Sequence, residues 1–302
     1  MKKPMPLKVG DLVTIAAPAR KVTPDEVLPA IKMLESWGLN VLVDNGIYQE
    51  YNQFAGTDVQ RAEVMQRLLD NRAVKAIFCA RGGYGTVRIV DRLDFSGFSQ
   101  NPKWIVGYSD ITVLHSHIER NFNIPTLHAT MPLDINGNPS LASESMRLCL
   151  FNDHLVQIYP LSSCEVANRV GECTAPVVGG NLSVLYSLLG SQSDIDTDGK
   201  ILLIEDLDEY LYHVDRMVMA LYRAGKFKHL KGLLVGAMSD MHDNVIPFGR
   251  SAEQIVRDAV AEYSYPVAYH CPIGHIKEKN MAMPLGIETN VRISENELMI
   301  SF

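Results

Sequence analysis

The chain has 302 residues, of which 47% are hydrophobic and 21% are charged. This length exceeds the size at which one hydrophobic core usually stops growing, so we expect two domains. Its 28 basic and 35 acidic side chains give a net charge of −7, and no run of lysines or arginines occurs. This charge pattern argues against nucleic acid or an anionic membrane surface as the main partner.

The first residues and the apolar runs indicate the cellular compartment in which the protein works. No apolar signal core follows the charged start before Gly10, and no apolar run approaches the length of a membrane span. We therefore expect a cytoplasmic protein. The five cysteines are widely and irregularly spaced, which is unlike a disulfide framework or a zinc motif.

Strands alternate with helices through the first half of the chain. We expect strands at residues 12–17, 40–43, 76–80, 104–107 and 126–128, and helices at 24–37, from 57, from 110 and at 141–150. Capping-box patterns begin at Thr23 and Thr57. This alternation predicts parallel βα units, whose loops at the carboxyl ends of the strands form the site.

The pattern changes to short β-rich pieces between residues 152 and 175, where we place the domain junction. The predicted division is 1–155 for the first domain, 156–175 for a linker and 176–302 for the second domain. In the second domain we expect helices after 181 and at 213–224 and 251–261, strands at 201–204, 233–236 and 266–269, and a hairpin pairing 291–293 with 298–300.

Ser109 lies where a buried strand passes through a sharp turn into a helix. A nucleophilic serine needs such an exposed place beside helix-start N–H groups. We expect Gly107 to take a backbone conformation that a bulkier residue would resist, which allows the turn to be tight. Serine is also a favoured helix N-cap, and Ile111 occupies the second glycine position of the G-x-S-x-G elbow. Ser109 alone therefore supports either interpretation.

Two further groups have the chemistry that a nucleophilic serine requires. Glu205 and Asp206 directly follow an apolar strand, and His275 lies in a loop rich in proline and glycine. A serine nucleophile needs a base for its proton and a carboxylate to orient that base. An acid at the end of a strand is more often solvated, and a loop histidine is usually polar surface.

A glycine-rich loop, Arg81–Gly85, follows the strand at 76–80. It matches neither G-x-G-x-x-G nor a Walker loop. Its exposed N–H groups suit half of an oxyanion hole as well as a phosphate cradle. No metal is expected, because His115 and His117 lie on different helix faces and no His-Glu-x-x-His occurs.

Taken together and in order, these motifs resemble a known family. They are Phe54–Asp58 with Arg61, Ala80–Gly85, Gly107–Asp110, Leu203–Asp206, Tyr212 with Asp215–Met217, Gly274–His275 and Pro284–Gly286. The set is similar to the L,D-carboxypeptidases of murein recycling, the muramoyltetrapeptide carboxypeptidases. The resemblance implies an α/β protein with a flavodoxin-like parallel-sheet N-terminal domain and a C-terminal α/β domain of mixed β-barrel character.

By matched position, the resemblance implies a triad assembled across the domain interface. Ser109 becomes the nucleophile, His275 the general base and Glu205 the acid that orients the imidazole. The oxyanion hole becomes the backbone N–H of Asp110 with one from Gly82 or Gly83.

Two residues of the glycine-rich loop are candidates for substrate binding, Arg81 and Tyr84. Arg81 is a candidate cation for the carboxylate of D-alanine, although it could instead brace the loop. Relatives tend to have Gly-Pro where this chain has Ala129-Thr130, and a glycine where it has Ile276. These departures leave the triad intact and concern the shape of the pocket.

The family reaction removes the terminal D-alanine of cytoplasmic murein tetrapeptide through an acyl-enzyme, without a metal or an organic cofactor. The implied partner is the murein peptide, with a homodimer as a further possibility. One alternative is an immunity-type relative that hydrolyses peptidyl or aminoacyl nucleotide antibiotics. Another is a non-catalytic module that binds a small anion on the glycine-rich loop.

Overall fold

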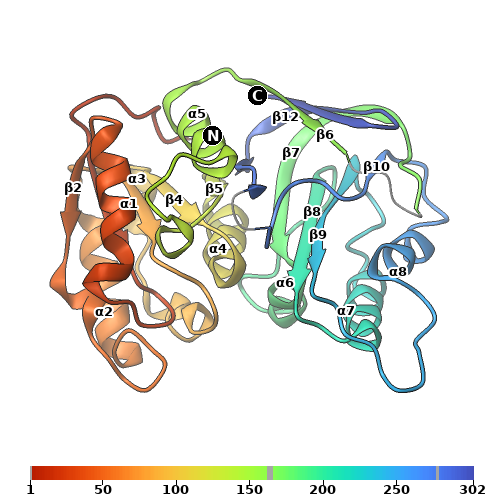
Figure 1. Cartoon of the computed structure of the whole chain (residues 1–302), viewed down its shortest axis with the longest axis horizontal. Coiled ribbons are helices and arrows are strands. Elements are labelled where there is room, and N and C mark those ends of the chain that lie inside the picture. The colour runs from red at the N-terminus through yellow and green to blue at the C-terminus, as the bar shows by residue number, and fades with distance from the viewer. Residues whose placement is uncertain (1, 162–165, 277–278) are drawn as a thin grey trace.

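The computed structural model describes residues 2–161, 166–276 and 279–302. Two sheets lie side by side, each with its own helices, and both chain ends lie in the region between them (Figure 1). No helix within the described ranges is long and apolar enough to cross a membrane.

The first sheet has six strands in the order β11-β5-β4-β3-β1-β2. Its strands are β1 (Leu12–Ala16), β2 (Asn40–Val43), β3 (Val74–Cys79), β4 (Trp104–Gly107), β5 (Thr126–His128) and β11 (Met283–Leu285). Strands β1 to β5 pair in parallel, whereas β11 joins the edge antiparallel to β5. The parallel order 2-1-3-4-5 is that of flavodoxin, which confirms the expected N-terminal fold.

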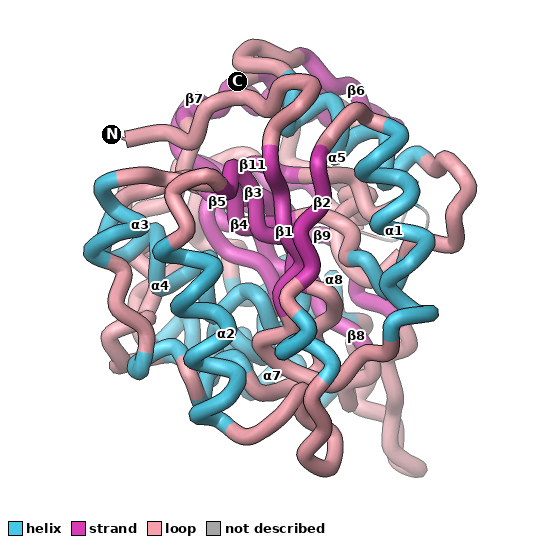
Figure 2. The backbone as a smooth tube through the Cα atoms, turned by 90° about the vertical axis from the view of Figure 1, so that its left-hand side faces the viewer, coloured by secondary structure: helices cyan, strands magenta, loops and turns pink. Residues whose placement is uncertain are grey.

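Helices cover both faces of this sheet (Figure 2). On one side lie α1 (Pro24–Ser36) and α5 (Leu141–Phe151), and on the other α2 (Asp58–Asp70), α3 (Ser96–Gln100) and α4 (Thr112–Phe122). Short 3-10 turns occur at Asn45–Tyr48, Thr86–Arg88, Val90–Arg92, Ser109–Ile111 and Pro132–Asp134. The predicted capping boxes at Thr23 and Thr57 are confirmed, since each hydroxyl accepts the N–H three residues on.

The second sheet has seven strands in the order β10-β9-β8-β7-β12-β13-β6. Its strands are β6 (Val156–Pro160), β7 (Gly171–Asn181), β8 (Ile201–Leu207), β9 (Gly232–Ser239), β10 (Val267–Ala268), β12 (Glu288–Ile293) and β13 (Glu297–Ser301). Strands β7 to β10 are parallel, and β12, β13 and β6 are antiparallel. This sheet is therefore mixed, as expected, and its helices are α6 (Leu182–Leu188), α7 (Leu211–Arg223) and α8 (Ala252–Ala259).

The segment 156–175, which we expected to be a linker, differs from that prediction where the structure describes it. Residues 156–160 form β6 and residues 171–175 begin β7, while 162–165 lie outside the described residues. The partners of β6 and of the start of β7 are β13 and β12, from the last fifteen residues of the chain. A pairing between segments so far apart has no local sequence signal.

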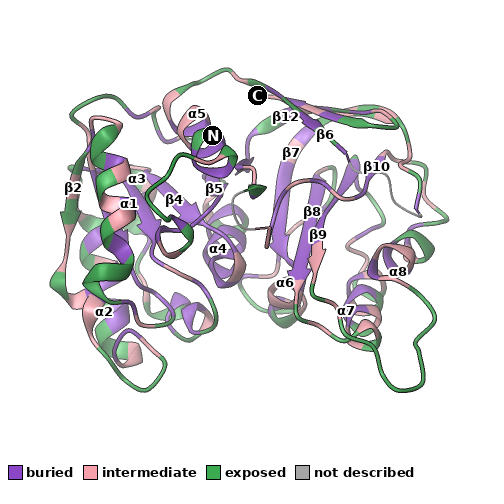
Figure 3. Ribbon diagram, viewed as in Figure 1, coloured by how far each residue is buried: buried purple, intermediate pink, exposed green. Residues whose placement is uncertain are grey.

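Helix α4 of the first domain is the main contact with the second. At its start, the Asn181 N–H donates to Thr112 Oγ1 at 3.0 Å. Near its middle, Ser116 Oγ donates to the carbonyl of Ser193 at 2.6 Å. The central strands of both sheets are buried, whereas the edge strands β2 and β6 carry exposed residues (Figure 3). The contacts of α4 therefore fix the carboxyl end of β4 relative to that of β7.

One glycine of β7 offers a test of how closely β7 packs against β8. Gly179 has φ +122°, and a Cβ placed on it would lie 2.0 Å from the carbonyl oxygen of Leu203. We expect Gly179→Ala to lower the free energy of unfolding by about 3 kcal/mol or more, because the backbone of β8 cannot yield. The matched control is Gly190→Ala, which has φ +77° and open space around it and should lose only about 1–2 kcal/mol. Equal losses in urea unfolding would contradict the steric explanation.

Candidate active site

Ser109 itself adopts the strained conformation of the turn. Its φ is +63°, in the left-handed region that residues with a Cβ seldom occupy. Gly107 serves a different purpose from the one we expected, because a Cβ there would lie 2.9 Å from Ile111 Cγ1. The missing Cβ at Gly107 thus lets the helix start pack close to β4, and the serine takes the left-handed conformation at the tip.

The glycine-rich loop lies directly against this turn. A Cβ on Gly82 would be 3.1 Å from Ser109 Oγ and 3.2 Å from the backbone nitrogen of Asp110. The buried carboxylate of Asp110 holds the loop there, since it accepts the N–H of Thr86 at 2.9 Å and its hydroxyl at 2.6 Å. The structure therefore brings together the loop and the turn, as predicted from their places at the ends of β3 and β4.

Arg61 links the glycine-rich loop to a second loop, the one that follows β1. Its guanidinium is buried and donates to the carbonyl of Pro18 and, at 2.9 Å, to that of Gly85. Its charge is balanced by Asp58, whose Oδ1 lies 2.5 Å from Nη2. This one side chain links the loop after β1 to the glycine-rich loop after β3.

Glu205 and His275 form a buried pair at the end of β8. His275 Nδ1 lies 2.6 Å from Glu205 Oε2, and the carboxylate is fully buried. Two glycines make room for it: a Cβ on Gly274 would lie 2.6 Å from Glu205 Oε2, and one on Gly236 would lie 3.0 Å from Glu205 Cβ. The bond occupies Nδ1 and leaves Nε2 as the ring nitrogen that can exchange a proton.

Glu205 and His275 shift each other's pKa in the directions that favour the ionised carboxylate and the protonated imidazole. Burial raises the pKa of Glu205, but the two neighbouring imidazoles, His128 and the directly bonded His275, outweigh burial and lower it to about 2. Burial lowers the pKa of His275, yet the hydrogen bond and charge of Glu205 leave it raised above its usual value. The carboxylate is thus ionised at neutral pH, and the imidazole is a stronger base than an ordinary histidine.

Asp206 has a role separate from that of Glu205. Its oxygens accept Asn181 Nδ2 at 2.9 Å and the N–H of Ser183 at 2.8 Å. Burial, with the nearby charge of Glu205, raises its pKa to about 7. Of the two carboxylates predicted from sequence, Glu205 is therefore the one that bonds His275, and Asp206 bonds the start of α6.

The nucleophile candidate and the histidine share one cavity. It has a volume of about 470 Å³ and is lined by Arg20, Arg81, Gly82, Gly83, Ser109, Asp110, Met131, Leu133, Asn181, Ser183, Val184, Asp206, Leu207, Asp208, Glu209 and His275. The ring of Tyr108, which precedes Ser109, lies 4.7 Å from the ring of His275. Within the described ranges no hydrogen bond joins Ser109 Oγ to His275; such bonds are often absent before substrate binds.

The two substrate-binding candidates differ in position. Arg81 lines the cavity and donates to the carbonyl of Lys21 at 3.3 Å. Tyr84 is not among the described residues that line it; its ring is 45% exposed and 6.3 Å from the ring of Phe54.

Sequence reasoning missed Arg20, whose side chain lies over Gly83, and Asn181. Arg20 follows β1, and Asn181 is the last residue of β7, which pairs in parallel with β8. The rule that sites gather at the carboxyl ends of such strands would have found them.

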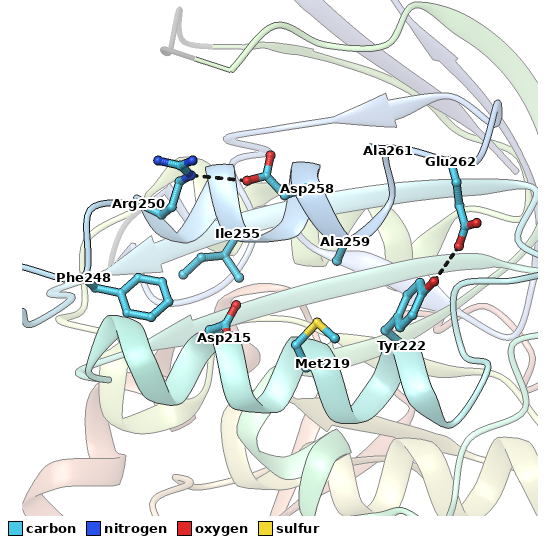
Figure 4. A pocket seen from close by; sticks show the side chains of 10 residues that line it. All are labelled: Asp215, Met219, Tyr222, Phe248, Arg250, Ile255, Asp258, Ala259, Ala261 and Glu262. Atoms are coloured by element: carbon cyan, nitrogen blue, oxygen red, sulfur yellow. Dashed lines mark hydrogen bonds and ion pairs between the residues drawn. The ribbon is translucent and has the colours of Figure 1, made fainter.

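A second hollow lies far along the second domain, between α7 and α8 (Figure 4). Its volume is about 540 Å³, and its lining includes Met219, Phe248 and Ile255, with an ion pair between Arg250 and Asp258 at the rim. The described residues that line it include no serine, cysteine or histidine. This hollow therefore lacks the residues of a Ser-His or Cys-His nucleophile.

Comparison with known proteins decides the family. A model described as the LD-carboxypeptidase N-terminal domain matches residues 13–129, and one described as the LD-carboxypeptidase C-terminal domain matches residues 174–291. The chain belongs to the LD-carboxypeptidase family. The expectation of a serine-type L,D-carboxypeptidase is thereby confirmed.

Relatives of this L,D-carboxypeptidase match along nearly its whole length. The probable murein peptide carboxypeptidase of Bacillus subtilis is 34% identical, covering 99% of this chain and 94% of its own. The murein tetrapeptide carboxypeptidase of Pseudomonas aeruginosa is 28% identical, covering 91% of each chain.

Two solved structures show the same fold. The muramoyltetrapeptide carboxypeptidase from Oxalobacter formigenes has a TM-score of 0.85 at 24% identity, covering 96% of this chain and 98% of its own. The microcin C7 self-immunity protein MccF, in complex with aspartyl sulfamoyl adenosine, has a TM-score of 0.84 at 20% identity, covering 98% and 97%.

The buried pair predicts the behaviour of His275 in solution. Glu205→Gln removes the charge that raises the pKa of His275 and leaves the burial that lowers it, so this pKa should fall below about 6.5. The measurement is a titration of the His275 ring by nuclear magnetic resonance. The matched control is Glu209→Gln, which removes a cavity carboxylate bonded to His213 instead and should leave His275 unchanged. An unchanged pKa in Glu205→Gln would contradict the electrostatic account.

Proposed function

We propose that this enzyme removes the terminal D-alanine from murein tetrapeptide through an acyl-enzyme on Ser109. The single observation that carries the proposal is the 2.6 Å bond between His275 Nδ1 and Glu205 Oε2 on the wall of the cavity that Ser109 also lines. The family and the names of its relatives supply the reaction class and the substrate.

In this mechanism His275 Nε2 takes the proton of Ser109 as the oxygen attacks the carbonyl of the bond to D-alanine. Glu205 fixes the ring with Nε2 toward the serine and stabilises the imidazolium that forms. His275 then protonates the departing amine of D-alanine. In the second half, His275 takes a proton from water, which attacks the ester and releases Ser109.

The oxyanion of each tetrahedral intermediate requires donors beside Ser109. We assign the backbone N–H of Asp110 and one from Gly82 or Gly83 to this role. The close approach of Gly82 to Ser109 and to the Asp110 nitrogen, which leaves little room for a Cβ, supports it. Preorganised backbone donors of this kind typically contribute about 10²–10³-fold in rate each.

The charges along the cavity suit a peptide with a terminal carboxylate and a diamino acid. Arg20 and Arg81 lie on the side of the glycine-rich loop, where a guanidinium would bind the carboxylate of D-alanine. Asp208 and Glu209 also line the cavity, and their carboxylates would favour the free ammonium group of a diamino acid. Tyr84 has no place in this arrangement, because it does not line the described cavity.

The alternative is a hydrolase of peptidyl or aminoacyl nucleotides. A nucleobase would need an aromatic surface for stacking, and no Phe, Tyr or Trp is among the described residues that line the cavity. The relatives named carboxypeptidases are the more similar in sequence, at 34% and 28% identity against 20% for MccF. Both observations favour the murein peptide.

Ser109→Ala tests the proposal. We expect the purified protein, with a chelator present, to release D-alanine from murein tetrapeptide, and the variant to lose at least about 10⁴-fold in kcat/KM because no other group can form the ester. Mass spectrometry follows D-alanine, and Ser187→Ala, an exposed serine of α6, is the control and should retain full activity.

Two other outcomes have definite meanings. Turnover that survives Ser109→Ala would contradict the serine mechanism. A folded wild-type protein that leaves the tetrapeptide intact and cleaves an aminoacyl nucleotide would support the alternative substrate.

A further inference from the structure

A second histidine, His128, lies beside the catalytic pair and has no place in the mechanism above. It is the last residue of β5, fully buried, with Gly107 and Met283 as its neighbours in the sheet. Neither of its ring nitrogens has a hydrogen-bond partner within the described ranges. A buried polar group without a partner is costly, so its presence calls for a reason.

The nearest charged atom to this ring is on Glu205. His128 Nε2 lies 3.9 Å from Glu205 Oε1, and Oε1 also lacks a hydrogen-bond partner among the described residues. The other oxygen, Oε2, is the one bonded to His275. The carboxylate therefore lies between two imidazoles, one bonded and one within reach of a small side-chain rotation.

The other groups around His128 provide no reason for a histidine at this buried position. The ring of Tyr108 lies 5.8 Å away and that of His115 lies 6.4 Å away. His115 is equally buried but bonds Gly107 O and Thr126 Oγ1 through its two nitrogens, as a structural histidine does. Among the titratable groups around His128 in the part of the chain that the structure describes, only Glu205 offers an acceptor without a partner.

We propose that His128 is a positioning residue, a neutral imidazole that carries its proton on Nε2 and directs it to Oε1 of Glu205. It would fix the carboxylate rotamer and stabilise its charge without adding a positive charge beside His275. A protonated His128 would compete with His275 for the carboxylate and make the base weaker. The proposal rests on the proposed function only in that Glu205 and His275 are the pair that activates Ser109.

The consequence concerns the basicity of His275. Without the donor on Oε1, the carboxylate is less stabilised and attracts the His275 proton more strongly. In His128→Leu, the pKa of His275 should therefore rise by about 0.5–1 pH unit. The acid limb of kcat/KM should move to higher pH with it, and kcat should fall roughly tenfold. A residue that only fills space would leave the pKa of His275 where it is.

The test is a titration of His275 by nuclear magnetic resonance in wild type, His128→Leu and His128→Gln. Glutamine keeps a side-chain N–H donor and does not titrate, so it should restore the wild-type pKa. The control is His117→Gln, a buried histidine of α4 bonded to Ser193, which should leave His275 unchanged. An unchanged His275 in a folded His128→Leu, or an equal rise in both His128 variants, would overturn the proposal.

A second measurement uses the wild-type protein, so it does not depend on whether a variant folds. Nitrogen chemical shifts should show His128 neutral, with its proton on Nε2, across the pH range in which His275 titrates. A proton on Nδ1 alone, or a charged His128 at neutral pH, would overturn the proposal. Neither titration requires turnover, so a failure of the murein peptide assay would leave this result separate and interpretable.

Discussion

The buried hydrogen bond between His275 and Glu205 is the interaction on which the rest of the site depends. A carboxylate without exposure is unfavourable unless a partner compensates it, and here an imidazole 2.6 Å away does so. A Cβ on Gly274 would occupy the space that this carboxylate fills, and one on Gly236 would lie 2.5 Å from the carbonyl oxygen of Ile273 and 3.0 Å from Glu205 Cβ. The second domain thus holds the proposed base already oriented, with Nδ1 bonded and the residue lining the cavity.

The first domain supplies what this base requires, and α4 connects the two. The same helix begins at the Ser109 turn and bonds the second domain through Thr112 and Ser116. Gly180 permits the approach, since a Cβ there would lie 2.5 Å from Thr112 Oγ1. Small changes in how the domains pack would therefore alter the distance between nucleophile and base without touching either residue.

Local signals in the sequence predicted much of the fold and the candidate site. The capping boxes, the alternation of strands and helices, and the position of Ser109 after β4 are features of short segments, and the structure places them as expected. Glu205 was expected directly after its strand, but it lies within β8, which continues to Leu207. The role of Gly107 was misjudged, because whether a glycine serves conformation or close packing depends on a neighbour that folding supplies. Arg20 was missed because nothing in its own segment marks it as part of a site.

The segments that the sequence could not place depend on distant partners. Strand β11 joins the first sheet from residues 283–285, and β6 pairs with β13 near the end of the chain. The unpaired ring of His128 likewise has meaning only beside Glu205, which is 77 residues further along the chain and in the other domain. No periodicity or spacing rule relates such positions.

The most direct test of the central claim is covalent labelling with a fluorophosphonate that reacts only with an activated serine. After brief treatment and proteolysis, mass spectrometry should find the phosphonyl group on Ser109 alone, and His275→Ala should abolish the labelling in a protein that remains folded. A folded wild-type protein that hydrolyses murein tetrapeptide but is labelled on another serine, or not at all, would contradict the claim that the two domains meet to activate Ser109.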